Sequence, residues 1–427
     1  MVHRGRTLRA GVVLVTAATL AGVGCTSSDE SGAPSTAKGG VSTTAAPKYA
    51  APPAGLPAFY GVPDPLRDAP AGALLKSEKV AEPELHGTVY RVMYTSRSVR
   101  NETVAVTGIV IVPKGPAPAN GYPVVTWGHG TNGMADKCAP SLRPESAVPL
   151  ANSLLDRGWL VVASDYEGEG TPGLMPYIAG ISEARSTIDI VRAARQLDGS
   201  QASNEYVVWG HSQGGHTAMF ALDMAAAYAP ELQLRGVVAG APPSQFALIY
   251  AYLKESPYRY YLLMAAGGLN AAHGDDAAPL DEVLTPEGLA LLPELEKGCA
   301  DYLSDKLGNI STASVTKADP FTVPAWRKIL AANDPANFTT PAAVPLLMIQ
   351  GGSDEQIPTA STQLLATQLC TIGQQLERWI YPGQSHAGVI AVSGPDMVHW
   401  ISDRYSGVEK TYVPTGQDDI QRTACPR

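Results

Sequence analysis

Gly210-His211-Ser212-Gln213-Gly214 lies between a short apolar run, Tyr206 to Trp209, and a helix-forming stretch, Gly215 to Tyr228. A chain that passes from a buried strand into a helix over so few residues must turn sharply at Ser212. The glycines two positions before and after the serine relieve the crowding of such a turn. The turn lifts the hydroxyl above the sheet and directs the helix N-terminus at any negative charge formed there. The stretch therefore predicts an α/β fold with Ser212 as a nucleophile.

A serine nucleophile needs a base and a carboxylate that orients the base. In folds built on this turn the order along the chain is serine, acid, histidine. The apolar run Val344 to Gln350 ends in Gly351-Gly352-Ser353-Asp354, which places Asp354 directly after a strand. The run Leu376 to Tyr381 leads into a loop of small residues that contains His386. We therefore expect Asp354 as the acid and His386 as the base.

Other candidates for these two roles lie nearby in the sequence. Glu355 adjoins the expected acid but stands one residue further from the turn. His399 lies in a stretch expected to be helical, Pro395 to Tyr405, where a packed or exposed histidine is the usual case. His211 and His216 flank the nucleophile and are expected to be structural.

An oxyanion hole requires two backbone N–H donors beside the nucleophile. One belongs to the residue after the serine, which is Gln213, and the other comes from the loop after an early central strand. The run Val124 to Trp127 continues into Gly128-His129-Gly130-Thr131-Asn132-Gly133, whose glycines allow close approach of the backbone. We expect Thr131 as the second donor.

Buried-strand candidates alternate with helix candidates along most of the chain. This alternation predicts a doubly wound, mostly parallel α/β sheet, preceded by an antiparallel pair at 87–97 and 103–112. The strand candidates are Pro123–Trp127, Leu160–Ser164, Tyr206–Trp209, Gly236–Ala239, Pro345–Gln350 and Leu376–Tyr381. The helix candidates are Ala147–Arg157, Ile181–Leu197, Gly215–Tyr228 and Thr359–Ile372. In the second of these helices, Arg185, Arg192 and Arg195 are expected to face water.

The alternation stops at residue 243 and resumes after residue 340. The intervening stretch begins with five tyrosines between 250 and 261 and has helical pieces around Leu280 to Leu295. An insertion of this length usually covers an active site, and the tyrosines favour a wall that faces the substrate. A surface excursion without function is the alternative. We expect residues 58–242 and 341–427 to form the core and residues 243–340 a cap or lid.

The N-terminus has the pattern of an export signal. Arg4, Arg6 and Arg9 precede an apolar run, Ala10 to Leu20, that is too short to cross a bilayer. Gly22-Val23-Gly24-Cys25 resembles a lipoprotein cleavage site, which predicts a signal peptide over 1–24 and a diacylated Cys25. An ordinary secretory signal is the alternative. Residues 25–57 are rich in Ser, Thr, Ala, Gly and Pro and are expected to form a tether to the outer face of the membrane.

Five short motifs resemble those of the secretory lipase family of α/β-hydrolases, a group that includes lipase A and secreted actinobacterial esterases. They are W-G-H-G-T (127–131), S-D-Y-E-G-E-G (164–170), G-H-S-Q-G-G (210–215), G-G-S-D (351–354) and S-H-A-G (385–388). The resemblance implies a lid after the sixth strand and hydrolysis of acylglycerols or simple esters. It also implies an acidic residue near the site, either Asp165 or Glu167.

Four cysteines remain once Cys25 is set aside, namely Cys138, Cys299, Cys370 and Cys425. In an oxidising compartment an even number favours two disulfides, and no C-x-x-C or H-E-x-x-H spacing supports a metal site. Four cysteines allow three pairings. We prefer Cys138–Cys299 with Cys370–Cys425, because each bridge would fasten a segment short of core contacts. The resemblance implies one bridge in each place.

Together these features predict an extracellular serine hydrolase that cleaves carboxylic esters through an acyl-enzyme, without a cofactor. The substrate would be a lipid or small ester, and the protein a monomer. Acyl transfer to an alcohol or glycan, a peptidase, and a non-catalytic surface binding protein on the same fold are the alternatives. The formal net charge of −9 and the lack of a basic patch argue against nucleic-acid binding.

Overall fold

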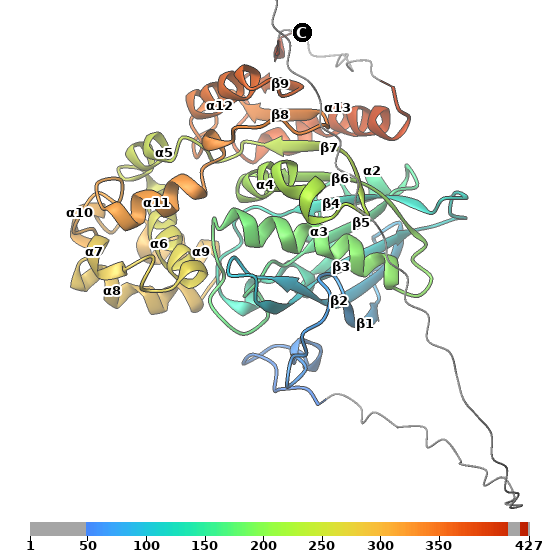
Figure 1. The fold of residues 1–427 in the computed structure, drawn as a ribbon, viewed down its shortest axis with the longest axis horizontal. Coiled ribbons are helices and arrows are strands. Elements are labelled where there is room, and N and C mark those ends of the chain that lie inside the picture. The colour runs from blue at the N-terminus through green and yellow to red at the C-terminus, as the bar shows by residue number, and fades with distance from the viewer. Residues whose placement is uncertain (1–47, 409–418, 426–427) are drawn as a thin grey trace, which may run out of the picture. The chain divides into compact units, whose positions relative to one another are not determined.

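The computed structural model describes residues 48–408 and 419–425, which contain one ten-stranded sheet (Figure 1). The strand order is β1-β2-β3-β5-β4-β6-β7-β8-β9-β10. The strands are β1 (Leu74–Val80), β2 (Gly87–Arg97), β3 (Thr103–Pro113), β4 (Tyr122–Gly128), β5 (Leu160–Ser164), β6 (Ala202–His211), β7 (Gln233–Gly240), β8 (Leu346–Gly351), β9 (Leu376–Tyr381) and β10 (Gln421–Ala424).

The six central strands, from β5 to β9 in the sheet order, are parallel to one another. The strands β1, β2 and β3 join one edge of this block in antiparallel pairs, and β10 joins the other edge. The expected doubly wound α/β fold is therefore confirmed. Its carboxyl-terminal edge collects the loops that follow β4, β6, β8 and β9, where ligands bind in such sheets.

Helices cover both faces of the sheet because its central strands are apolar on both sides. Alternate residues such as Val124 and Val208 pack against α3, α4 and α12, whereas Val125 and Val207 pack against α1, α2 and α13. These helices are α1 (Pro144–Ala147), α2 (Ala151–Leu155), α3 (Gly180–Gln196), α4 (Gln213–Tyr228), α12 (Thr359–Thr371) and α13 (Gly388–Tyr405).

The helix α3 is more deeply buried than its sequence pattern indicates. Of the three arginines expected to face water, only Arg195 is exposed, while Arg185 and Arg192 are half-buried. The segment before β1 lies across this helix, and Gln196 Nε2 donates a 2.6 Å hydrogen bond to the carbonyl of Gly72. The expectation was wrong because the segment that covers α3 comes from a part of the chain far away in sequence.

Seven short helices lie between β7 and β8, in the insert (residues 243–340), and appear together at one end of the sheet in Figure 1. The insert has its own apolar core, which Met175 and Tyr177 from the loop after β5 complete. The insert follows β7, the seventh strand, and not the sixth as expected. The difference arises because the sequence did not predict β1. Its helices are α5 (Phe246–Leu253), α6 (Tyr260–His273), α7 (Leu280–Val283), α8 (Pro286–Leu291), α9 (Ala300–Leu307), α10 (Thr312–Val315) and α11 (Pro324–Ala332).

Two expected boundaries differ in the structure. The tether expected over 25–57 is too long at its end, because Tyr49 already pairs with Pro63 and Ala50 N donates to Val62 O at 2.8 Å. The helix expected over 147–157 is broken by Leu150, whose φ of 57° is left-handed.

The signal peptide expected over 1–24 and Cys25 lie outside the described residues. Within the described ranges no helix is both long and apolar enough to cross a membrane.

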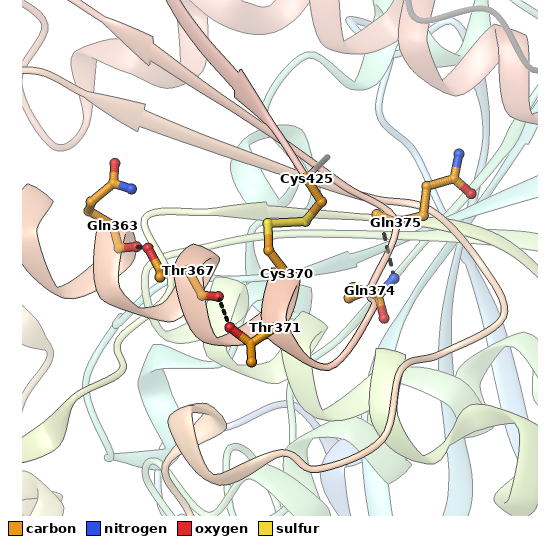
Figure 2. The surroundings of a disulfide bond; sticks show 7 residues. All are labelled: Gln363, Thr367, Cys370, Thr371, Gln374, Gln375 and Cys425. Atoms are coloured by element: carbon orange, nitrogen blue, oxygen red, sulfur yellow. Dashed lines mark hydrogen bonds between the residues drawn. A yellow bond between two sulfur atoms is a disulfide. The ribbon is translucent and has the colours of Figure 1, made fainter. Parts of the chain in front are cut away.

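The structure contains two disulfides, which join the preferred pairs. Cys138–Cys299 links the loop after β4 to the insert. Cys370–Cys425 links the last turn of α12 to the residue after β10 (Figure 2). The second bridge holds a short edge strand whose side chains are all exposed.

Candidate active site

Ser212 occupies the sharp turn between β6 and α4. Its φ of 59° and ψ of −122° lie in a region that non-glycine residues rarely adopt. The backbone around it is well bonded, since Ser212 N donates to Gly240 O at 2.9 Å and His216 N donates to Ser212 O at 3.0 Å. The turn thus places the hydroxyl at the N-terminus of α4, as the sequence motif predicts.

The turn requires glycine where β4 and α4 meet. A Cβ atom built on Gly214 would lie 1.8 Å from the carbonyl oxygen of Gly128, and one built on Gly210 would lie 2.0 Å from the carbonyl oxygen of Gly214. Gly128 and Gly210 cannot move apart, because they pair with each other across the adjacent strands β4 and β6. The close approach brings the loop after β4 to the nucleophile: a Cβ on Gly130 would lie 3.6 Å from Ser212 Cβ.

Asp354 and His386 meet at the ends of β8 and β9. The imidazole Nδ1 lies 2.9 Å from each carboxylate oxygen. Asp354 Oδ1 also accepts backbone hydrogen bonds from Gln356 at 2.9 Å and Ile357 at 2.8 Å, so the loop closes around the carboxylate. Glu355, the alternative acid, instead accepts a 3.0 Å hydrogen bond from the backbone N–H of His386. One acid therefore contacts the ring of the base and its neighbour contacts the backbone.

The electrostatics of this pair favour an ionised acid. Burial alone would raise the pKa of Asp354, but the hydrogen bond from His386 and the two backbone N–H groups hold that pKa below its usual range. A charged carboxylate at Nδ1 fixes the imidazole tautomer whose Nε2 is free to accept a proton. This arrangement suits His386 to act as a general base.

The remaining histidines of interest have other surroundings. The ring of His211 is buried and lies 4.6 Å from that of His386, and burial together with His386 lowers the pKa of His211 to about 3. His216 Nε2 lies 2.7 Å from the carbonyl oxygen of Asn333. His399 is exposed on α13, on a face away from the buried side of the helix. None of them adjoins Asp354 in the way that His386 does.

The loop after β4 is held from three directions. Tyr166 donates a 3.2 Å hydrogen bond to His129 O, the hydroxyls of Thr131 and Tyr177 lie 2.8 Å apart, and Ala300 N donates to Asn132 O at 2.8 Å. The last contact comes from the insert, next to the Cys138–Cys299 bridge. Thr131, an expected oxyanion donor, thus lies in a loop that neighbouring segments hold in place, and Gln213, the other expected donor, begins α4 directly after Ser212.

Two acidic residues after β5, Asp165 and Glu167, form hydrogen bonds with neighbouring segments. Asp165 is fully buried and accepts hydrogen bonds from Thr107 and from the backbone and hydroxyl of Ser141. Glu167 accepts one from the hydroxyl of Ser182. These contacts hold the surrounding loops in place, and neither acid lines the cavity beside Ser212. In the described ranges no group of three or more His, Cys, Asp or Glu side chains is arranged to hold a metal ion.

A cavity of about 150 Å³ opens beside Ser212 and Gln213 and extends into the insert. Apart from these two residues its lining is mostly aliphatic and aromatic, and it includes Phe246, Leu263 and Trp326. The tyrosine-rich start of the insert contributes to this lining through Tyr250, Tyr260 and Tyr261. The turn at Ser212 therefore faces an apolar cavity.

Two residues of the site carry no signal in the sequence. Tyr177 lines the cavity and contacts Thr131, although it comes from an irregular loop. Glu183 lies in the first turn of α3 and is 1% exposed, where its side chain reaches Gln213. A carboxylate in a first helical turn is ordinarily read as a solvated charge that favours the helix dipole. Both roles arise from contacts between segments distant in sequence.

Residues 141–412 match the family model described as secretory lipase, and the match includes the nucleophile turn and the Asp354–His386 pair. The chain belongs to the secretory lipase family. The secreted triacylglycerol lipase LIP4 of Malassezia globosa is 26% identical over 382 residues, which cover 82% of this chain and 80% of that protein. A Mycobacterium tuberculosis protein named "Probable inactive lipase" is 24% identical over 382 residues, 82% of each chain.

Solved structures share the fold of this secretory lipase. Candida antarctica lipase A in its closed state aligns with a TM-score of 0.70 at 22% identity, over 81% of this chain and 85% of that one. The ligand-bound rice cell wall degrading esterase LipA from Xanthomonas oryzae aligns with a TM-score of 0.62 at 22% identity, over 80% and 97%. With the family match and the lipase relatives, the chain is a carboxylic ester hydrolase, and with its two disulfides it is an extracellular protein.

Proposed function

We propose that this secretory lipase hydrolyses acylglycerols or simple lipid esters with Ser212, His386 and Asp354 as its catalytic triad. One observation carries the proposal. The strained serine turn opens into an apolar cavity, and the ring of His386, oriented by Asp354, packs against the residue that precedes the serine. A nucleophile, an oriented base and an apolar chamber together are what cleavage of a lipid ester requires.

The first half-reaction is acylation. His386 Nε2 removes the hydroxyl proton as Ser212 Oγ bonds to the ester carbonyl carbon, and Asp354 stabilises the resulting imidazolium. The carbonyl oxygen becomes an oxyanion, which accepts hydrogen bonds from the backbone N–H groups of Gln213 and Thr131. When the intermediate collapses, the bond to the alkoxy oxygen breaks and His386 gives its proton to the leaving alcohol.

The second half-reaction is deacylation. His386 removes a proton from water while the water oxygen bonds to the acyl carbon, and the same two N–H groups receive the oxyanion. Collapse of this intermediate releases a carboxylic acid and returns the proton to Ser212 Oγ. His211, neutral because its pKa lies near 3, adds no second titration to this cycle at neutral pH.

The apolar cavity supports a substrate with an acyl chain. Each methylene of an acyl chain that leaves water for such a lining contributes about 0.8 kcal/mol. The insert that supplies most of the lining thereby acts as the acyl-binding wall. Relatives named as secreted triacylglycerol lipases, including LIP4 and LIP2 of Malassezia globosa, support a glycerol ester as the substrate.

Export and anchoring complete the proposal. Cleavage of the leader before Cys25 and acylation of that cysteine would hold the enzyme, as a monomer, at the outer face of the membrane. Mass spectrometry of the mature N-terminus in the native host tests this. A diacylglyceryl-modified Cys25 supports the anchor, and an unmodified residue after a nearby cleavage site excludes it.

A panel of p-nitrophenyl esters from short to long acyl chains, combined with labelling by a fluorophosphonate probe, tests the reaction. We expect labelling at Ser212 alone and release of free acid from the esters. Transfer of the acyl group to an added alcohol in preference to water would make the enzyme an acyltransferase. A folded protein that neither labels nor turns over would be a non-catalytic member of the family.

A further inference from the structure

Glu183 is a buried carboxylate with three hydrogen-bond donors around it. Oε1 accepts from Gln213 Nε2 at 2.8 Å and from the backbone N–H of Ile178 at 2.9 Å, and Oε2 accepts from Thr217 Oγ1 at 2.7 Å. His216 Nδ1 lies 3.8 Å from Oε2. A buried carboxylate with this many donors is held in one orientation, and it holds its donors in turn.

Two of these donors belong to the site. Gln213 directly follows Ser212, and Ile178 lines the cavity. Ile178 has a φ of 61°, an unusual backbone conformation for a β-branched residue, and Ser212 has a φ of 59°. Such conformations persist only where the surroundings hold them. The carboxylate of Glu183 thus binds both the side chain of Gln213, which follows the strained Ser212, and the backbone of the strained Ile178.

We propose that Glu183 is a positioning residue of the ester hydrolysis. It anchors the side chain of Gln213, so that the backbone N–H of that residue keeps its direction toward the oxyanion, and it fixes Ile178 in the wall of the acyl cavity. This inference rests on the proposed function through the role of Gln213. Its physical basis is preorganisation: a donor already aimed at the developing charge needs no reorganisation during the reaction.

A purely structural role for Glu183 makes a different prediction. If Glu183 only links α3 to α4, it would contribute to stability alone. Its removal would then lower stability and kcat as the removal of any other buried side chain of α3 does. Ile188 supplies that comparison, because it is fully buried in the same helix, in the core beside the sheet, and does not line the cavity. The Ile188→Ala variant is therefore the matched control for loss of stability.

The experiment compares kcat and KM of Gln213→Met, Glu183→Ala, Glu183→Gln and Ile188→Ala with those of the wild type. Gln213→Met keeps the backbone N–H and the side-chain length but removes the amide that reaches Glu183. Glu183→Gln keeps an acceptor for the two N–H donors, and Thr217 can then turn its hydroxyl toward Gln213 O, its other acceptor at 3.1 Å. Fluorophosphonate titration counts active serines, so kcat is expressed per folded site.

We expect Gln213→Met and Glu183→Ala each to lower kcat on the order of 10–100-fold, because a misdirected donor is weakened but not lost. The double variant should be no slower than the slower single variant, since both remove the same contact. Glu183→Gln should recover most of the rate. The KM for a long-chain ester should rise in Glu183→Ala but not in Gln213→Met, because only the former releases Ile178.

The inference is overturned if Gln213→Met keeps the wild-type kcat, or if the two effects multiply in the double variant. It is also overturned if Ile188→Ala lowers kcat per active serine as much as Glu183→Ala does. If Glu183→Ala fails to fold, the kcat values of Gln213→Met and Glu183→Gln still test the inference. A wild-type enzyme without labelling or turnover would instead overturn the proposed function, so the two failures are distinguishable.

Discussion

Ser212 combines the hydroxyl that we propose as the nucleophile with a backbone conformation that costs on the order of 1–3 kcal/mol. The neighbouring glycines and the hydrogen bonds to Gly240 and His216 hold this conformation in place. The strain is therefore a property of the turn and not of the side chain. Removing the hydroxyl and removing the strain should consequently have separable effects.

Substitution of Ser212 tests this separation. Ser212→Ala keeps the strained φ and should fold with wild-type stability, yet lose on the order of 10⁴-fold or more in esterase kcat, because no acyl-enzyme can form. Ser212→Gly should be equally inactive but more stable, by roughly 1 kcal/mol, because glycine adopts a positive φ readily. Urea denaturation and ester hydrolysis measure the two effects. Substantial turnover by purified Ser212→Ala would refute the nucleophile assignment.

The choice of base is tested by two histidine substitutions on neighbouring parts of the chain. His386→Ala should lower kcat nearly as far as Ser212→Ala, because it removes the group that Asp354 orients. His399→Ala should change kcat less than about 3-fold, since surface substitutions away from a site are usually mild. The measurement is ester hydrolysis per folded molecule, with folding checked by circular dichroism. A reversed result would assign the base to His399.

At the scale of elements, the sequence predicts best what depends on local pattern. The expected bounds of β5 and β9 agree with the structure, and β5 is apolar up to its last residue because a central strand covered on both faces buries every side chain. The edge strands β1 and β10 were missed, because β1 has a polar middle, Lys76 to Lys79, and β10 is exposed throughout, so that both resemble loops. The short helices of the insert likewise depend on packing within their own core more than on periodicity.

The same distinction applies to the site. Ser212, Asp354 and His386 could be proposed from sequence because each follows a recognisable strand end. Tyr177 and Glu183 could not, since their positions depend on which segments meet in space. A loop after β5 reaches Thr131, and the first turn of α3 reaches α4. The chain order of motifs thus predicts the reacting groups but not the residues that support them.

The disulfides permit a test at the element scale. Cys138–Cys299 closes a separation of 161 residues and fastens the loop after β4 to the insert, whereas Cys370–Cys425 closes 55 residues at the far edge of the sheet. Replacing either pair by serines should lower the free energy of unfolding by roughly 2–5 kcal/mol. Only the Cys138→Ser/Cys299→Ser variant should also lower kcat per active serine, because it frees the backbone around Asn132. Equal kcat for the two variants would contradict this role.

At the scale of the whole molecule, buried acids behind the site give the fold a pH dependence. Burial raises the pKa of Asp165 to about 6, although hydrogen bonds from Ser141 and Thr107 oppose the shift. Its value in the unfolded chain is about 3.9. Above pH 6 the carboxylate is ionised in both states, and the folded state bears the cost of the buried charge. As the pH falls from about 6 toward 4, the folded state takes up a proton that the unfolded state does not, so stability rises.

This shift of about two pKa units corresponds to roughly 3 kcal/mol. The pKa of Asp354 is displaced in the opposite direction, so the stability that Asp354 contributes is present above about pH 4 and is lost below it. His211 has the opposite effect to Asp165, because its pKa of about 3 leaves the folded state without a proton that the unfolded state binds below about pH 6.5. Urea denaturation at pH 5 and pH 8 measures the net difference in stability. Asp165→Asn should lower the stability at pH 5 relative to that at pH 8, whereas the exposed control Asp198→Asn should leave the wild-type difference unchanged. If Asp165→Asn kept the full wild-type difference, the proton uptake would belong to another of the buried acids, such as Glu169, whose pKa burial raises as well.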